Sequence, residues 1–77
     1  MEESDLALVV EALKQVQAQR HFSLEGLARL LGFSPSHLSM IFAGQRRPGL
    51  RLMRSAIRHF PEIRALIKER LDMKTPL

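Results

Sequence analysis

The chain has 77 residues, with 12 Lys or Arg, 8 Asp or Glu and no cysteine. A domain of this length buries only about 60% of the surface that its unfolded chain exposes, so we expect one small domain with a thin core. Without cysteine, disulfides and thiolate metal sites are excluded. The apolar runs are far below the roughly 20 residues of a membrane span, and the first residues are acidic where a signal peptide is basic. We therefore expect a cytoplasmic protein with no membrane partner.

The positive charge is concentrated in the second half of the chain. The net charge of +4 combines a balance of −2 over residues 1–43 with a balance of +6 over residues 44–77. Such an uneven distribution predicts one face that attracts polyanions. A solvated surface that serves only solubility would fit the same totals.

Helical periodicity recurs five times, and no stretch alternates apolar and polar residues as a strand does, so the sequence predicts an all-α fold. We expect a single domain over residues 1–77 with helices at about 4–19, 24–31, 35–43, 50–59 and 61–72. The predicted inward residues are Leu6, Val9, Val10, Leu13 and Val16 in the first helix, Leu50, Met53, Ile57 and Phe60 in the fourth, and Ile63, Leu66, Ile67 and Leu71 in the fifth.

Two helix starts of the same kind flank one glycine. Ser23 and Ser34 stand where a hydroxyl can cap the second and third helices. Phe22 and Phe33 precede them, each five residues before a leucine, which is the spacing of a hydrophobic staple. Gly32 lies where a left-handed residue ends the second helix. These local signals predict two short helices joined by a tight turn.

The paired helices carry small or apolar residues at seven diagnostic positions, namely Leu27, Ala28, Leu31, Gly32, Phe33, Leu38 and Ile41. With five helices and the stretch IFAGQRRPGL after the turn, residues 6–67 resemble the phage repressor and Cro superfamily, also called the xenobiotic-response-element type. The resemblance implies a compact five-helix lambda-repressor-like domain with its helix-turn-helix at the second and third helices. It also implies double-stranded DNA as the partner and no cofactor.

In this family the third helix lies in the major groove with its N-terminal end toward the bases. The resemblance therefore implies base-reading roles for Pro35, Ser36, His37, Ser39 and Met40. Many members place glutamine where Leu24 and Pro35 stand here. We accordingly expect modest direct readout, with DNA shape and backbone contacts supplying more. His37 fits a base reader and a surface histidine equally well, and Met40 fits a groove contact or a protein contact.

The loop before the fourth helix approaches the phosphate backbone in the family. The phosphate-binding residues implied by the resemblance are Ser34, Gln45, Arg46, Arg47 and Arg51. Arg54 and Arg58 continue the same side of the fourth helix, where they would contact phosphates or pair with acids.

The stripe of the fifth helix, Ile63, Leu66, Ile67 and Leu71, has two interpretations. It could enter the core, or it could pair with a second copy, because two-fold dimers are how this superfamily reads near-palindromic sites. No cluster of His, Asp or Glu has metal-ligand spacing and no serine has a partnered base, so we predict neither a metal site nor an enzyme.

Two functions remain open. The first is a nucleoid-associated transcription regulator, a repressor that binds a near-palindromic operator as a dimer. The alternative is a helix-turn-helix protein-interaction module that binds polymerase, an antitoxin partner or another regulator. Leu24 and Pro35, which are poor phosphate and base readers, and the exposed apolar Met40 favour the second.

Overall fold

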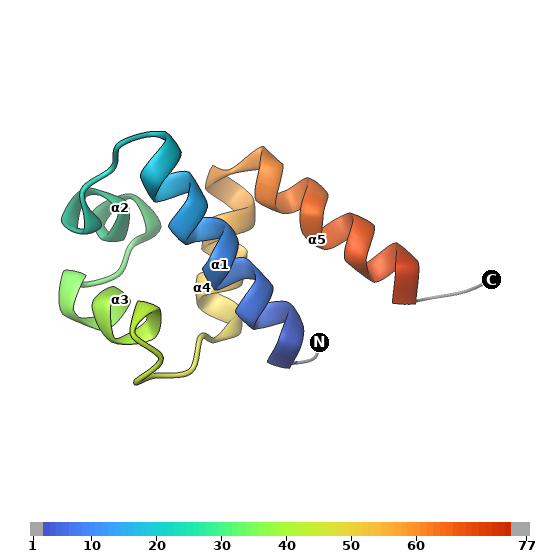
Figure 1. Ribbon diagram of the computed structural model, residues 1–77, viewed down its shortest axis with the longest axis horizontal. Helices are drawn as coiled ribbons and strands as arrows, with labels where there is room; N and C mark the ends of the chain where they lie inside the picture. Colours follow the sequence, from blue (N-terminus) through green and yellow to red (C-terminus); the bar gives the residue numbers. More distant parts are fainter. Residues whose placement is uncertain (1–2, 75–77) are drawn as a thin grey trace.

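The computed structural model describes residues 3–74, which fold into five helices with no strand in that range. The helices are α1 (Glu3–Gln19), α2 (Leu24–Leu31), α3 (Pro35–Phe42), α4 (Leu50–His59) and α5 (Pro61–Lys74) (Figure 1). The predicted all-α fold is confirmed. Each helix begins and ends within two residues of the predicted bounds.

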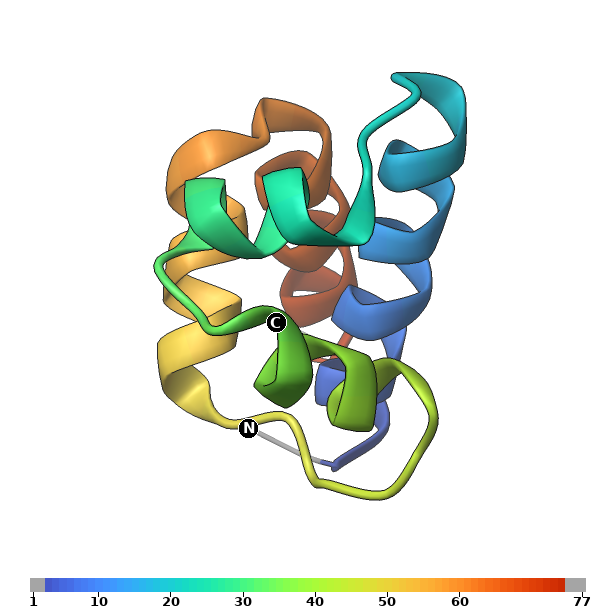
Figure 2. The same cartoon turned by 90° about the vertical axis from the view of Figure 1, so that its left-hand side faces the viewer.

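The helices pack around α1 and α4, which contact each other and α5. Helix α1 contacts α3, α4 and α5, and α2 contacts α3 and α4. Figure 1 shows α2 and α3 together at one end of the molecule, while α5 runs from the opposite side of α4 toward the other end. Figure 2 looks onto the first end and shows α2 lying across the molecule above α3. This arrangement leaves the helix-turn-helix at one end, with three helices behind it.

Every helix contributes to one hydrophobic core. Its large side chains with less than 2% exposure are Val9, Leu13, Leu27, Leu38, Leu52, Phe60 and Ile63. Phe60, between α4 and α5, meets the ring of Phe22 edge-on at 6.2 Å between centroids. Offset and edge-on arrangements are favourable for aromatic pairs. The segment before α2 is thereby attached to the far side of the core.

The predicted inward stripe of α4 was partly wrong. Leu50 is 51% exposed, whereas Leu52 and Ala56 are buried. Leu50 is the first residue of α4 and follows an exposed connection, so no neighbouring helix covers it. Leu52 and Ala56 lie one turn apart and face the other helices. The stripe is therefore set by where α4 meets its neighbours.

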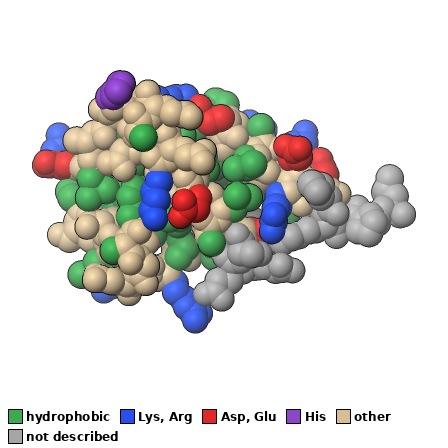
Figure 3. All heavy atoms as spheres, viewed as in Figure 1, with side chains coloured by type: hydrophobic (Ala, Val, Ile, Leu, Met, Phe, Trp, Pro, Cys, Tyr) green, Lys and Arg blue, Asp and Glu red, His purple; other side chains and the backbone are tan. Residues whose placement is uncertain are grey.

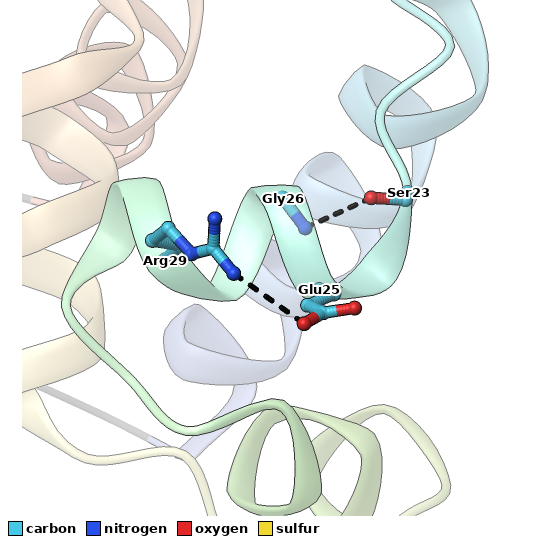
Figure 4. Close-up of polar contacts among 4 residues, drawn as sticks. All are labelled: Ser23, Glu25, Gly26 and Arg29. Carbon is cyan, nitrogen blue, oxygen red and sulfur yellow. Dashed lines mark hydrogen bonds and ion pairs between the residues drawn. The ribbon is translucent and has the colours of Figure 1, made fainter.

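The predicted ends of the two short helices are confirmed. The Ser23 hydroxyl accepts a hydrogen bond from the Gly26 amide at 2.9 Å (Figure 4), and the Ser34 hydroxyl accepts one from the His37 amide at 3.1 Å. Gly32 has φ of 81°, in the left-handed region. Its amide donates to the Arg29 carbonyl at 3.2 Å, and the Phe33 amide donates to the Ala28 carbonyl at 2.8 Å. This is a Schellman motif, which ends α2 and directs the chain into α3.

Replacing Gly32 by valine should destabilise the protein by about 1–2 kcal/mol, the usual cost of the left-handed conformation for a residue with a Cβ. A Cβ at this position would meet no atom within 4 Å, so the loss comes from the backbone and not from a clash. Urea denaturation measures it. Gly32→Asn is the matched control with a smaller loss, because asparagine tolerates this conformation. Equal stability of the Val variant and the wild type would contradict the left-handed turn.

One buried charge was not predicted. The Asp5 side chain is 2% exposed and accepts a hydrogen bond from Nε of Arg70 at 3.1 Å. The Arg70 side chain is 43% exposed, so the pair lies at the edge of the core and joins the start of α1 to α5. A buried carboxylate needs such a partner, because an unpaired one is strongly destabilising.

Candidate nucleic-acid interface

The predicted base-reading residues lie on the exposed side of α3. Pro35, Ser36 and Ser39 are exposed, and Met40 is 40% exposed. His37 is half-buried, and its ring lies 5.3 Å from that of Phe33. The structure thus places hydroxyls and a thioether on one outward surface.

The opposite side of α3 holds the helix in place. Leu38 and Ile41 are three residues apart and both are buried in the core. Helix α2 supports them with its own buried residues, Leu27, Ala28 and Leu31. The two helices therefore form one rigid unit in which the exposed side of α3 has a set direction.

Arg51 is held beside the turn between α2 and α3. Its guanidinium donates to the Gly32 carbonyl at 3.1 Å and lies over the Phe33 ring at 4.9 Å from the centroid. Because His37 contacts the same ring, the arginine lies near the N-terminal end of α3. A side chain held in this way loses less conformational entropy when it binds a phosphate.

The connection between α3 and α4, residues 43–49, folds back on the end of α3. The Gln45 and Arg46 amides donate to the Met40 carbonyl at 2.9 and 3.3 Å, and Gly44 has φ of 79°. The side chains of Gln45, Arg46 and Arg47 are exposed. They therefore stand next to the exposed side of α3, where the sequence analysis expected phosphate contacts.

A shallow groove of about 720 Å³ separates this connection from α1. Leu6, Val10 and Phe42 give it an apolar surface, and the ion pair between Lys14 and Glu11 lies on its α1 wall. Figure 3 shows that face, with one blue and one red side chain side by side among green ones. The groove thus borders the predicted phosphate-binding loop on the side of α1.

The remaining predicted phosphate ligand is Ser34. It is exposed, but its oxygen already accepts the His37 amide as the cap of α3. A hydroxyl also carries one donor, so Ser34 can donate to a phosphate oxygen while it caps the helix. Capping and DNA contact are therefore compatible at this residue.

Several basic side chains outside this region have acidic partners. Arg29 pairs with Glu25 within α2 (Figure 4), and Arg20 pairs with Glu62 of α5. For Arg54 and Arg58, which are exposed on α4, no acidic partner occurs in the part of the chain that the structure describes. The pairing with acids considered for these two arginines is therefore not seen. The positive surface of the molecule follows the connection of residues 43–49 and α4.

The predicted dimer stripe of α5 is divided between core and surface. Ile63 and Ile67 are buried by contacts of α5 with α1 and α4. Leu66 is half-buried and Leu71 is 41% exposed. Within residues 5–72, the accessible apolar part of the stripe is thus Leu66 and Leu71.

Among the residues that the structure describes, no group of three His, Asp or Glu side chains is arranged as a metal site. None of the helices in this range has the length and apolar character of a membrane span.

Comparison with known proteins identifies the family. Residues 13–62, about two thirds of the chain, match the family model described as helix-turn-helix, which is of the Cro/C1 type. Searches of curated proteins and of solved structures gave no significant match. The match includes the caps, the turn, α3 and all of α4, so it covers the features described above. This chain therefore belongs to the Cro/C1-type helix-turn-helix family of DNA-binding transcription regulators.

Proposed function

We propose that the protein is a sequence-specific repressor, which binds a near-palindromic operator as a homodimer and acts by occupying a promoter. The five helices act as one DNA-binding unit, and the place of action is the nucleoid in the cytoplasm. The observation that carries the proposal is the exposed side of α3 beside a row of exposed cations. The family match supports a DNA-binding role for that geometry.

In the bound state, the exposed side of α3 enters the major groove. The Ser36 and Ser39 hydroxyls can donate to or accept from several bases, and Met40 can pack on a thymine methyl. Pro35 has no donor, and its ring suits the first position of the helix rather than a base contact. Direct readout is accordingly modest, and DNA shape contributes to site choice.

The cations beside α3 neutralise phosphates. Arg46, Arg47 and Arg51 flank the helix from its two ends, because the first two follow its C-terminus and the third lies beside the preceding turn. Contacts of this kind set the register of the protein on the duplex without reading the sequence. They also make the affinity depend on salt, because each neutralised phosphate releases counterions.

Dimerisation would use the accessible apolar residues of α5, Leu66 and Leu71. In a two-fold dimer the two α3 helices would read half-sites about one helical turn, roughly 34 Å, apart. Leu71→Asp should then weaken self-association, which sedimentation equilibrium measures, while leaving the exposed side of α3 unchanged.

Fluorescence anisotropy against pooled random duplexes, at two salt concentrations, tests the proposed function. The expected result is binding that weakens steeply with salt, and enrichment of a two-fold motif after repeated selection. Arg64→Ala with Lys68→Ala, two exposed cations on α5, is the matched control and should leave the affinity nearly unchanged. Absence of binding at low salt would contradict the proposal.

Ser36→Ala and Ser39→Ala should change which duplexes are selected more than they change total affinity. Each removes a donor and acceptor from the exposed side of α3, and a mismatched contact at one base pair costs about 1–3 kcal/mol. Selection from the same random pool measures the change in motif. Identical motifs for the wild type and both variants would show that these hydroxyls do not read bases.

A second function is favoured by one observation. Met40 and Leu50 are exposed apolar side chains at the two ends of the connection between α3 and α4. They would suit a protein partner on the same surface, with weak or no specific DNA binding. The two functions differ in the anisotropy experiment, because this alternative gives no selected motif.

A further inference from the structure

A second groove lies between the end of α2 and the length of α4, away from the connection of residues 43–49. It has a volume of about 470 Å³, and the side chains that matter to its chemistry are Leu30, Arg51, Arg54, Ser55, Arg58 and His59. Figure 2 shows the end of α2 lying next to α4. We call this the α2–α4 groove.

The α2–α4 groove is strongly cationic. Arg51, Arg54 and Arg58 follow one another at helical spacings of three and four residues, and no acidic residue lines the groove. The Arg51 guanidinium already donates to the Gly32 carbonyl and lies over the Phe33 ring. Arg54 and Arg58 have no acidic partner among the described residues, and both are exposed. Two guanidiniums are therefore available side by side for an outside carboxylate.

Hydrogen bonds to backbone carbonyls hold the wall of the groove in place. The Ser55 hydroxyl donates to the Leu31 carbonyl at 2.7 Å and joins α4 to the end of α2. His59 hydrogen-bonds through Nδ1 to the Ser55 carbonyl at 3.1 Å. An incoming ligand therefore meets a preformed surface, which lowers the entropic cost of binding.

An apolar side chain completes the surface. Leu30 is 40% exposed at the mouth of the groove, on the exposed side of α2. The backbone of DNA offers phosphates for the arginines but no apolar group that would cover Leu30. A protein segment offers both carboxylates and apolar side chains, and guanidiniums bind carboxylates in bidentate pairs. The combination of arginines with a leucine therefore favours a peptide.

The position of Arg58 along α4 also separates it from the proposed DNA interface. Arg58 follows Arg51 by seven residues, which corresponds to about 10 Å of helix rise. Arg51 lies beside the turn and α3, so Arg58 is further along α4 from that turn than Arg51, the arginine of this helix assigned to a phosphate. The end of the α2–α4 groove at Arg58 can thus be occupied while α3 lies on DNA.

We propose that the α2–α4 groove is a docking surface for an acidic segment of a partner protein that also carries apolar side chains, bound through Arg54 and Arg58 with Leu30 in apolar contact. The groove would join a DNA-bound regulator to an acidic protein. This inference does not require the operator to be palindromic or the outcome to be repression.

The probe is a fluorescein-labelled synthetic helix with glutamates spaced three and four residues apart and leucines on the adjoining face. A second peptide with glutamine in place of each glutamate is the charge control. Anisotropy titrations use the full chain, its Arg54→Ala/Arg58→Ala variant and its Arg64→Ala/Lys68→Ala variant. The last removes two exposed cations of α5 outside the groove. Circular dichroism verifies that all three proteins are folded.

The expected result is binding of the acidic peptide that falls at least about tenfold in Arg54→Ala/Arg58→Ala and less than about twofold in the α5 control. Leu30→Ser should also weaken binding of the acidic peptide. The glutamine peptide should bind weakly to all of the proteins. DNA affinity should be nearly unchanged by Arg54→Ala/Arg58→Ala. This last measurement separates the docking surface from the proposed DNA interface.

Four results would overturn the inference. One is no binding of the acidic peptide to the wild-type chain. Another is equal loss in the groove variant and the α5 control, which would indicate attraction by net charge alone. The third is a loss of DNA affinity in Arg54→Ala/Arg58→Ala as large as that in a variant of Arg46 and Arg47, because the groove would then belong to the DNA interface. Self-association that disappears in the groove variant would assign the surface to a second copy and likewise overturn it.

Discussion

Replacing Arg46 and Arg47 together by alanine should weaken binding to every duplex, specific or not, by on the order of tenfold to hundredfold at moderate salt. Both side chains are exposed on the connection that folds back on the end of α3. Two phosphate contacts release about two counterions, so the slope of log affinity against log salt should fall by about 1.8. Anisotropy titrations at a series of salt concentrations measure both quantities.

The selected motif should stay the same in this variant, since phosphate contacts position the protein without reading bases. Arg64→Ala with Lys68→Ala removes the same charge from α5 and is the matched control. If both double variants lost affinity equally, the attraction would be due to net charge and not to phosphate contacts of Arg46 and Arg47. An unchanged salt slope in the variant of Arg46 and Arg47 would equally contradict the assignment.

Phe60→Ala should cost about 3–5 kcal/mol of folding free energy, as large-to-small changes of aromatic core residues do. Phe60 is 1% exposed, its ring meets Phe22 edge-on, and the Arg20 guanidinium lies 5.3 Å from its centroid. A chain of 77 residues has a total stability of roughly 4–12 kcal/mol, at about 0.05–0.15 kcal/mol per residue. This single change should therefore remove a large part of it, and urea denaturation measures the loss.

Leu50→Ala, at the first residue of α4, is the matched control for Phe60, which caps the other end of that helix. Leu50 is 51% exposed, and surface substitutions usually change stability by less than about 0.5 kcal/mol. The pair of variants separates the observed stripe of α4 from the predicted one, in which both residues pointed inward. A loss at Leu50 comparable to that at Phe60 would show that Leu50 is covered in solution. Phe60 is buried and lies outside the exposed side of α3 and the connection of residues 43–49, so DNA binding by the folded fraction should be retained.

The local features of the fold could be predicted because their signals lie within a few residues. The caps at Ser23 and Ser34 and the left-handed Gly32 each depend on hydrogen bonds that span three to five residues. Such motifs are readable in the sequence before any tertiary contact is known. The bounds of α2 and α3, and the exposed side of α3, followed from them.

Features set by tertiary contacts could not be predicted. Asp5 and Arg70 are 65 residues apart, and nothing local marks them as partners. The contact of Arg51 with Gly32 and Phe33 depends on where α4 lies relative to the turn. It shows why the first arginine of α4, among three on one side, is held at the turn.

The burial of residues on α4 and α5 is also set by tertiary contacts and could not be fully predicted. Periodicity places Leu50 with Met53, and Leu71 with Ile67, on common stripes, yet the residues nearest the helix ends are the exposed ones. Helices in a small domain extend past their neighbours, so residues near their ends are left uncovered. The periodicity of the sequence does not show where along a helix this contact with its neighbours ends. The same effect leaves Leu71 accessible for self-association.

The most direct measurement is an amide chemical-shift titration of ¹⁵N-labelled protein with a duplex selected from the random pool. The expected result is that the largest shifts fall on Ser36, Ser39 and Met40, with further shifts at Arg46 and Arg51. The amides of Gln15 and Gln19, exposed on α1, should stay in place. Unchanged α3 signals, with the largest shifts elsewhere, would contradict insertion of α3 into the major groove.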